Sequence, residues 1–170
     1  AFSNCIGLTS IDIPSSISSI NGWVFQSCHN LTSVNIPSSV TSICESAFFD
    51  CVSLPYISIP ASVTSIGEEA FFSCDELADI LVAEGNPSYS SINGVLYNHD
   101  ASNLICCPMR KESVVIPNSV TMISGYAFSG CSSLTSISIP NSVSAIGNEA
   151  FSNCSRLTSI SIPYSVISIG

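Results

Sequence analysis

The sequence predicts a repeat solenoid, mainly β, of about seven stacked coils. The chain aligns with itself at a period of 23 residues, with the pattern A-F-x-x-C-x-x-L-x-x-I-x-I-P-x-x-V-x-x-I-G-x-x. Copies of this repeat begin at Ala1, Val24, Ala47, Ala70, Ala127 and Ala150. The apolar residues fall at the same positions in every copy. One coil cannot bury them, whereas stacked coils form a continuous core.

The segment L-x-x-I-x-I is the first expected element, because its end alternates apolar and polar residues with the period of a half-buried strand. The proline that follows removes a backbone donor and ends the strand. Strands are expected near Ile11–Ile13, Val34–Ile36, Ile57–Ile59, Ile80–Val82, Val114–Ile116, Ile137–Ile139 and Ile160–Ile162. Stacked coils would place these strands side by side in a parallel sheet at roughly 4.8 Å spacing.

The rest of each repeat predicts three short elements. V-x-x-I is expected to form a second short strand, and the glycine after it allows a turn. A-F-x-x-C is expected to be a compact, short helical turn that leads into the next strand. Together these elements give each coil two strands and one helical turn.

The segment from Ala70 to Tyr126 is irregular and is expected to hold two coils. Val95–Tyr97 and Leu104–Cys106 are β-prone runs separated by turn-forming residues, which predicts a β-hairpin near 94–107. Tyr89 and Ile92 keep the V-x-x-I spacing before it, so the hairpin is expected to replace the helical turn and to project from that edge. Insertions often mark a functional face. The alternative is an inherited structural variant of the repeat.

Residues 1–170 are expected to form a single solenoid domain. Residue 1 already lies inside a repeat, and Gly170 ends part-way through another. This predicts that the chain is a piece of a longer protein.

The regular repeats resemble the BspA-like leucine-rich repeats, also called the Treponema pallidum type. The resemblance is carried by sequences such as L-T-S-I-S-I-P-N-S-V-S-A-I-G-N-E-A-F at Leu134–Phe151, and it covers essentially the whole chain. The stretch Asn86–Pro108 is similar to a variant insert of that family. The resemblance implies a leucine-rich-repeat solenoid. It also implies a surface protein of the kind that mucosal bacteria and protists use to adhere to host matrix proteins or to other cells.

Six cysteines recur at one position of the repeat. They are Cys5, Cys28, Cys51, Cys74, Cys131 and Cys154. They form no C-x-x-C pairs and no histidine recurs beside them, so neither a metal site nor a cofactor is expected. We expect a structural ladder of buried thiols that hydrogen-bond to backbone carbonyls. Cys44 replaces the usual glycine, and Cys106 and Cys107 are adjacent with one side chain expected inward and one outward. The redox state of these three stays open.

The composition excludes several partner classes. Apolar residues make up 46% of the chain and charged residues 9%, against about 25% in typical domains. The net charge is −9, and the only basic residues are Arg110, Lys111 and Arg156. Binding to nucleic acid or to an anionic membrane surface is therefore not expected. No apolar stretch approaches the roughly 20 residues of a membrane span, so direct insertion is not expected either.

Candidate catalytic and cation-binding residues are few. His29 and His99 have no recurring serine or aspartate partner, so no catalytic site and no enzyme activity are expected. Acidic residues gather in and around two neighbouring coils. They are Glu68, Glu69, Asp75, Glu76, Asp79 and Glu84. Their spacing lacks the alternation of a calcium loop, which indicates a solvated acidic edge.

The outward positions of the strands hold small polar residues with few exceptions. Tyr56, Asp79, Leu81 and Val115 break this pattern, which predicts a partner-binding patch on the sheet. Phe49 and Phe72 share one position in adjacent coils and are expected to stack. Exposed aromatic residues are over-represented at binding hot spots. Trp23 and Tyr164 are also expected outside the core. The alternative is that these aromatic residues only pack against neighbouring turns or the hairpin.

These observations predict a non-enzymatic protein-binding module, and the resemblance places it at the cell surface or in secretion, with matrix proteins such as fibronectin or fibrinogen as candidate partners. The alternatives are a passive spacer, which monotonous hydroxyl columns would suit, or an intracellular scaffold, because free thiols suit a reducing compartment. Asn30 and Asn153 begin triplets that accept N-linked glycans in eukaryotic secretion. Their modification stays open.

Overall fold

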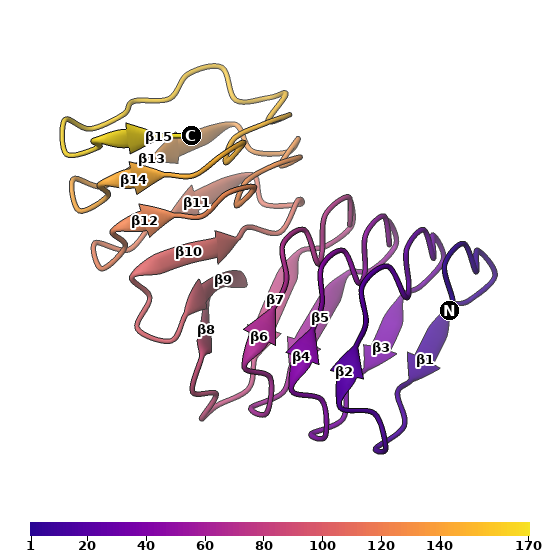
Figure 1. The fold of residues 1–170 in the computed structure, drawn as a ribbon. Coiled ribbons are helices and arrows are strands. Elements are labelled where there is room, and N and C mark those ends of the chain that lie inside the picture. The colour runs from indigo at the N-terminus through magenta and orange to yellow at the C-terminus, as the bar shows by residue number, and fades with distance from the viewer. The chain divides into compact units, whose positions relative to one another are not determined.

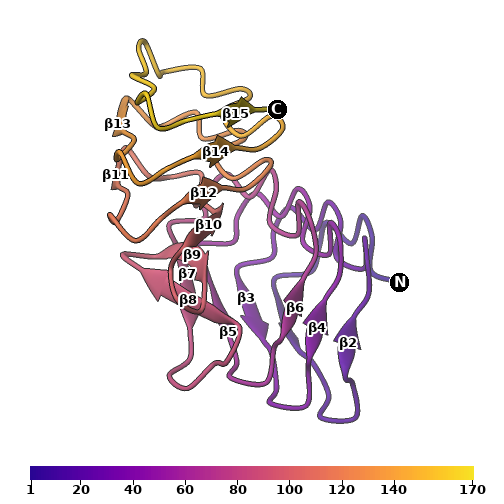
Figure 2. The same ribbon diagram turned by 60° about the vertical axis from the view of Figure 1, so that its left-hand side comes forward.

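The computed structural model describes all 170 residues and divides into two compact units. Unit 1 is Ala1–Ser88 and unit 2 is Tyr89–Gly170. In each unit the chain winds through successive coils, and short strands of neighbouring coils lie side by side (Figures 1 and 2). The mainly β repeat solenoid expected from the sequence is confirmed.

Unit 1 contains two kinds of strand. The strands of the L-x-x-I-x-I segment are β1 (Ser10–Asp12), β3 (Ser33–Asn35), β5 (Tyr56–Ile59) and β7 (Asp79–Val82). The strands of the V-x-x-I segment are β2 (Ser19–Ile20), β4 (Ser42–Ile43) and β6 (Ser65–Ile66). β1 pairs with β3, β5 pairs with β7, and β2, β4 and β6 form a three-stranded sheet, all in parallel. Partners such as Ser10 and Ser33 are one 23-residue repeat apart, so the sequence period sets the register.

Unit 2 has a six-stranded sheet and a two-stranded sheet. Its strands are β8 (Tyr89–Ile92), β9 (Val95–Asn98), β10 (Asn103–Cys106), β11 (Ser113–Val115), β12 (Met122–Ile123), β13 (Ser136–Ser138), β14 (Ala145–Ile146) and β15 (Ser168–Ile169). The larger sheet has the order β15-β14-β12-β10-β9-β8, and β11 pairs with β13. The strand expected at Ile160–Ile162 is reduced to one parallel bridge between Ser138 and Ser161.

The hairpin is present, but the expectation that it projects from an edge is wrong. β9 and β10 pair antiparallel, and β10 also pairs parallel with β12, with Leu104 beside Ile123. Val95, Tyr97 and Leu104 are buried in the hydrophobic core of unit 2. Since inward apolar side chains must be covered, the hairpin packs as part of the stack instead of standing away from it.

The turn before each first strand contains no helix, which corrects the expected helical turn. Trp23 and Ser27 have φ values of 59° and 55°, and an α-helix requires negative φ throughout. The Phe25 amide donates to the Ala47 carbonyl of the next coil at 3.0 Å, whereas the Cys28 amide closes a local turn onto the Phe25 carbonyl at 3.2 Å. Part of each turn's hydrogen bonding is therefore made with the neighbouring coil.

A column of phenylalanine rings runs through the core of each unit. In unit 1 the rings of Phe25 and Phe48 lie 5.2 Å apart, and those of Phe48 and Phe71 lie 6.0 Å apart. In unit 2 Phe128 and Phe151 stack at 4.9 Å with planes 9° apart. Equal spacing of the coils thus brings identical side chains into face-to-face contact.

Asn86 ends the buried valine column of unit 1. It stands one repeat after Val63, which like Val40 is fully buried. The Asn86 amide nitrogen donates to the carbonyls of Pro60 at 2.9 Å and Val63 at 3.0 Å, and its oxygen accepts the Ser88 amide at 2.8 Å. Every polar atom of this buried side chain therefore has a partner, as burial requires.

Candidate functional site

The outward face of β5 and β7 brings together three of the residues singled out in the sequence. Tyr56 pairs with Asp79 and Ser58 pairs with Leu81 in the parallel register. Tyr56 is 51% exposed and Leu81 45% exposed, while Asp79 is partly exposed. The strand-face patch, defined as Tyr56, Asp79 and Leu81, thus combines an aromatic ring, a carboxylate and an aliphatic side chain on rigid backbone.

A groove of about 480 Å³ lies beside this patch and is lined by residues of three coils. Tyr56, Ser58 and Leu81 contribute to it, with Ile59 and Pro60 from the corner where β5 ends. The groove forms because small side chains such as Ser58 alternate with larger ones along neighbouring strands. A shallow groove with mixed apolar and polar walls suits a polypeptide better than a small molecule, which usually requires an enclosed pocket.

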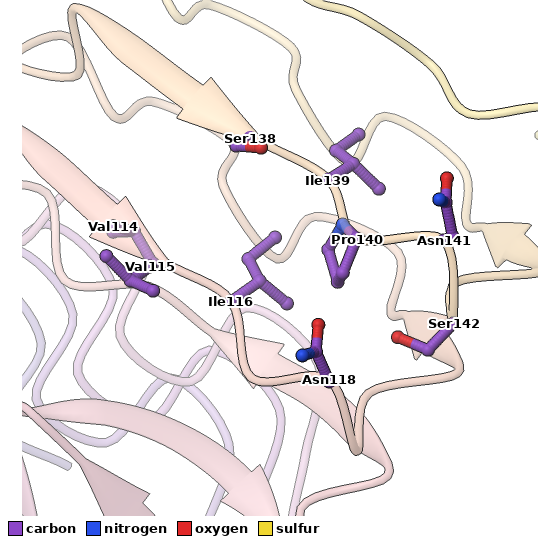
Figure 3. A pocket seen from close by; sticks show the side chains of 9 residues that line it. All are labelled: Val114, Val115, Ile116, Asn118, Ser138, Ile139, Pro140, Asn141 and Ser142. Atoms are coloured by element: carbon purple, nitrogen blue, oxygen red, sulfur yellow. The ribbon is translucent and has the colours of Figure 1, made fainter.

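Val115 belongs to unit 2 and lies in a second groove of about 850 Å³ (Figure 3). It is 85% exposed on β11 and pairs with Ser138 of β13. Asn118 and Asn141 lie on the proline corners of the two coils beside it. The structure therefore gathers Tyr56, Asp79 and Leu81, and it places Val115 among different neighbours.

Aromatic side chains also meet on the turns of unit 1. The expected stacking of Phe49 on Phe72 is confirmed, with ring centroids 5.5 Å apart and planes at 30°. Trp23 extends the contact, at 5.5 Å from Phe49 with planes at 46°. Trp23 is 44% exposed, and both phenylalanines are half-buried. Packing of Trp23 against a neighbouring turn was one of the alternatives from the sequence. Phe49 was not predicted as its partner, because the two residues hold different positions of the repeat.

The recurring cysteines hydrogen-bond to backbone carbonyls of the preceding coil. The thiols of Cys28, Cys51 and Cys74 donate to the carbonyls of the phenylalanines 26 residues earlier at 3.1, 3.2 and 3.1 Å. Cys154 does the same to Phe128 at 3.1 Å, and Cys131 approaches the Cys107 carbonyl at 3.6 Å. Cys5 lies at the exposed end of the row. All these sulfurs are unbridged.

Burial makes several of these thiols poor acids. It raises the pKa of Cys51 to about 12 and that of Cys154 to about 11, and it also raises the pKa of Cys28. The pKa of Cys131 is raised by a side-chain hydrogen bond with Cys107 and then by burial. A thiolate is the form that attacks or binds metal. Cys28, Cys51, Cys131 and Cys154 are therefore suited to packing and hydrogen bonding, not to nucleophilic chemistry.

The other three cysteines have individual surroundings. The Cys44 sulfur lies 3.6 Å from the Ser19 hydroxyl. In the next coil Gly67 stands at the position of Cys44, where a Cβ would overlap the backbone of the preceding coil. As a whole residue Cys106 is partly exposed, whereas Cys107 is buried. Burial raises the pKa of Cys106 to about 12.

His29 has a carboxylate partner that the sequence did not indicate. Its Nε2 lies 2.8 Å from Oδ2 of Asp50, and the Ser27 hydroxyl donates to the same oxygen at 2.9 Å. A catalytic triad places histidine between serine and aspartate, so that histidine takes the serine proton. Here aspartate is the shared acceptor. The arrangement ties two coils together at the surface and does not activate Ser27.

Groups of titratable side chains with metal-binding geometry are not found. No three of the histidine, cysteine, aspartate and glutamate side chains converge where they could hold a metal ion. Nor is any helix of the structure long and apolar enough to cross a bilayer.

Comparison with protein families identifies the repeat. The model described as BspA type leucine rich repeat region (6 copies) matches residues 1–105 and 105–170. The chain belongs to the BspA-type leucine-rich repeat family. Leucine-rich repeats of this type are a non-enzymatic fold for protein interaction.

Solved structures of bacterial proteins share the fold of these BspA-type repeats. A leucine rich cell surface protein from Faecalibacterium prausnitzii A2-165 is 37% identical, with a TM-score of 0.85, over 97% of this chain and 44% of that one. The pneumococcal vaccine antigen PcpA is 29% identical, with a TM-score of 0.86, over 94% of this chain and 40% of that one. A leucine-rich repeat protein from Eubacterium ventriosum is 28% identical, with a TM-score of 0.72, over 96% of this chain and 56% of that one.

The chain spans less than half the length of the first two of these proteins. No curated protein sequence matches it.

Proposed function

We propose that these BspA-type repeats are a non-enzymatic protein-binding module of a cell-surface or secreted protein, and that the module serves adhesion to host matrix proteins or to other cells. The observation that carries the proposal is the strand-face patch. On β5 and β7 an aromatic ring, a carboxylate and a leucine replace the small polar residues that fill most outward positions. Half-exposed tyrosine on rigid backbone is the usual starting point of a binding hot spot.

The surface location is supported by two similar proteins. One is described as a cell surface protein and the other as a vaccine antigen. A composition rich in serine and threonine keeps the coils soluble without strong charge, which suits a module that displays a long surface. Adhesion also suits the solenoid form, since stacked coils offer an extended and ordered area for a large partner.

The test is a titration of the chain against immobilised fibronectin and fibrinogen at two salt concentrations. The variant Tyr56→Ala/Asp79→Ala is expected to lower affinity by roughly tenfold or more, which is the loss typical of hot-spot residues. Ser113→Ala/Ser136→Ala is the matched control, because these serines pair at the same strand position in unit 2. Its affinity is expected to stay within about twofold of the parent, because surface hydroxyl-to-alanine changes have small effects.

A passive spacer is the second candidate, and the serine columns favour it. Ser113 and Ser136 on β11 and β13 repeat one small hydroxyl side chain with little to distinguish one coil from the next. Absence of saturable binding to both matrix proteins, or binding that the Tyr56→Ala/Asp79→Ala variant leaves unchanged and salt abolishes, would support the spacer.

An intracellular scaffold is the third candidate, since none of the nine cysteines forms a disulfide. Protease treatment of intact cells that express the natural protein separates it from the other two. A smaller amount of intact protein in treated than in untreated cells supports surface display. An equal amount supports the scaffold.

A further inference from the structure

Three aromatic side chains form a continuous strip on the turns of unit 1. This aromatic rail consists of Trp23, Phe49 and Phe72, joined by ring contacts of 5.5 Å between Trp23 and Phe49 and 5.5 Å between Phe49 and Phe72. The rail is separate from the buried phenylalanine column, and Trp23 is 44% exposed. Trp23 has a left-handed φ of 59°, and Ser46, Glu69, Tyr126 and Glu149 share this conformation at the same repeat position, so it belongs to the turn.

The fold does not require aromatic residues at the positions of Phe49 and Phe72. Ser129 and Ser152 stand in unit 2 where Phe49 and Phe72 stand in unit 1, as the third residue of their repeats. The same turns form there with the same hydrogen bonds to the next coil, for example from the Gly130 amide to the Ser152 carbonyl at 2.9 Å. The rail is therefore an addition to the coil that its folding does not explain.

The negative charge of the chain is concentrated in unit 1, which carries the rail. Residues 1–88 contain no lysine or arginine and nine of the 12 acidic residues. Glu45 and Glu68 are exposed on the turns that carry Phe49 and Phe72, and the Ser46 amide bonds to the Glu68 carbonyl at 3.0 Å across these coils. Asp75 and Glu76, also exposed, follow Phe72 directly after the turn.

Aromatic faces beside carboxylates select for cations. The ring face attracts a guanidinium or ammonium group, and a carboxylate pairs with the same group from the side. Arginine fits both, because its planar head stacks on rings and its apolar stem covers them. A ligand with negative charge would meet the repulsion of a unit that carries no basic side chain other than His29.

We propose that the aromatic rail and the carboxylates beside it form a docking surface for an arginine- or lysine-rich extended segment of a partner protein. The surface differs from the strand-face patch, and the proposal does not depend on the adhesive function of that patch. Trp23 and Phe72, the two ends of the rail, stack with the cationic heads, and the apolar stems cover Phe49 between them. Glu45 and Glu68 pair with the charges, and the acidic field of unit 1 accelerates the encounter.

The test uses a fluorescein-labelled peptide (Arg-Gly-Ser)₃ and the matched peptide (Glu-Gly-Ser)₃, with binding followed by anisotropy. Trp23 is the only tryptophan, so its emission reports contact at the rail directly. The basic peptide is expected to bind saturably and to change Trp23 emission, and the acidic peptide to do neither. Binding should weaken as salt increases, because the charged groups are exposed.

Two variants separate the rings from the charges. Phe49→Ser/Phe72→Ser introduces the residues that unit 2 carries at the same positions, and it is expected to weaken binding about tenfold. Glu45→Gln/Glu68→Gln keeps the rail and is expected to weaken binding about fivefold. Circular dichroism and thermal melting check that each variant is folded. If the serine variant fails to fold, the proposal is tested by the affinity of the glutamine variant and by the change in Trp23 emission on peptide binding.

Unchanged affinity in the serine variant would overturn the proposal, because the peptide would then be held by charge alone. Equal binding of both peptides, or binding indifferent to salt and to the glutamine variant, would also overturn it. The strand-face variant Tyr56→Ala/Asp79→Ala is expected to bind the basic peptide as the parent does. A loss in that variant would place the peptide on the other surface and reject the rail.

Discussion

Unit 1 and unit 2 build the same coil and present different surfaces. Cys51 and Cys154 bond to carbonyls of the preceding coil at 3.2 and 3.1 Å, and phenylalanine rings stack in both cores. Yet unit 1 has nine acidic and no basic residues, whereas unit 2 has three acidic and three basic ones. The inward positions determine the coil, and the outward positions are free to differ.

The two units also differ at their junction in sequence. Unit 1 ends its valine column with Asn86, whose side chain satisfies carbonyls of the preceding coil. Unit 2 begins with β8, β9 and β10, which pair antiparallel and bury Tyr97 and Leu104. Each unit therefore keeps its own core where the repeat becomes irregular, because its buried polar groups are paired and its apolar side chains are covered.

The largest expected effect tests the phenylalanine columns. Phe48 is fully buried between two rings, and its replacement by alanine is expected to destabilise the chain by about 3–5 kcal/mol. Phe128, equally buried, has one ring neighbour, so Phe128→Ala should have a smaller effect by about 1 kcal/mol. Urea unfolding followed by circular dichroism measures both. A larger loss for Phe128→Ala would show that stacking does not determine the difference.

The second effect tests Asn86. Asn86→Ala removes the donors to the Pro60 and Val63 carbonyls and is expected to lower the free energy of unfolding by about 2–3 kcal/mol. Asn118→Ala is the control, because Asn118 is an exposed asparagine of unit 2. It should change stability by less than about 0.5 kcal/mol. Equal effects in urea unfolding would mean that the buried hydrogen bonds of Asn86 contribute little.

The third effect concerns the thiols and pH. The pKa of Cys51 is about 12 in the folded chain, whereas an unfolded cysteine ionises near pH 8.5. The contribution of the Cys51 thiol to the free energy of unfolding is therefore complete below the pKa of the thiol in the unfolded chain. It is lost as pH rises toward 12. Cys154, with a pKa of about 11, should lose its contribution over a narrower range.

Urea unfolding at pH 7, 9 and 10.5 measures this loss. Cys51→Ala is expected to cost about 1–2 kcal/mol at pH 7 through its lost hydrogen bond and to reduce the decline at high pH. Cys154→Ala should reduce that decline less. A decline of the same steepness in Cys51→Ala as in the parent would exclude this thiol as its source.

The smallest effect concerns the hairpin, which unit 1 lacks. The Ser102 hydroxyl and amide donate to Asp100 at 2.7 and 3.0 Å and hold the pKa of its carboxyl below the usual value. The contribution of the Asp100 carboxylate to stability is present above its pKa in the unfolded chain. It is lost as pH falls through the lower pKa of this carboxyl in the folded chain. An NMR titration of the Asp100 carboxyl should show this low pKa, and Ser102→Ala should raise it. The same pKa in both proteins would contradict the role of Ser102.

Much of the fold could be predicted from the sequence, because inward residues recur with the period of the coil. The strands other than the one expected at Ile160–Ile162, their parallel register and the Phe49–Phe72 stack follow from that period. The role of Asn86 was accessible in the same way, since it stands one repeat after Val63. The spacing that assigned Tyr89 and Ile92 to the V-x-x-I segment instead obscured it.

Other features left no periodic signal. A-F-x-x-C is compatible with a helix or with successive turns, and only the left-handed φ values of residues such as Ser27 distinguish them. The His29–Asp50 pair joins different positions of adjacent coils, so aligning the repeats does not bring it together. Trp23 contacts Phe49 for the same diagonal reason. Predicting contacts of this kind requires the positions of side chains in neighbouring coils.

The hydrogen bonds between turns of neighbouring coils have a mechanical consequence. Bonds such as Phe25 to Ala47 and Ser27 to Phe49 hold one coil to the next. Tension applied along the stacking direction of a unit would break these hydrogen bonds one coil at a time. Each coil that opened would release 23 residues, or about 80 Å of extended chain. Under load the stack would lengthen stepwise while the remaining coils kept their structure.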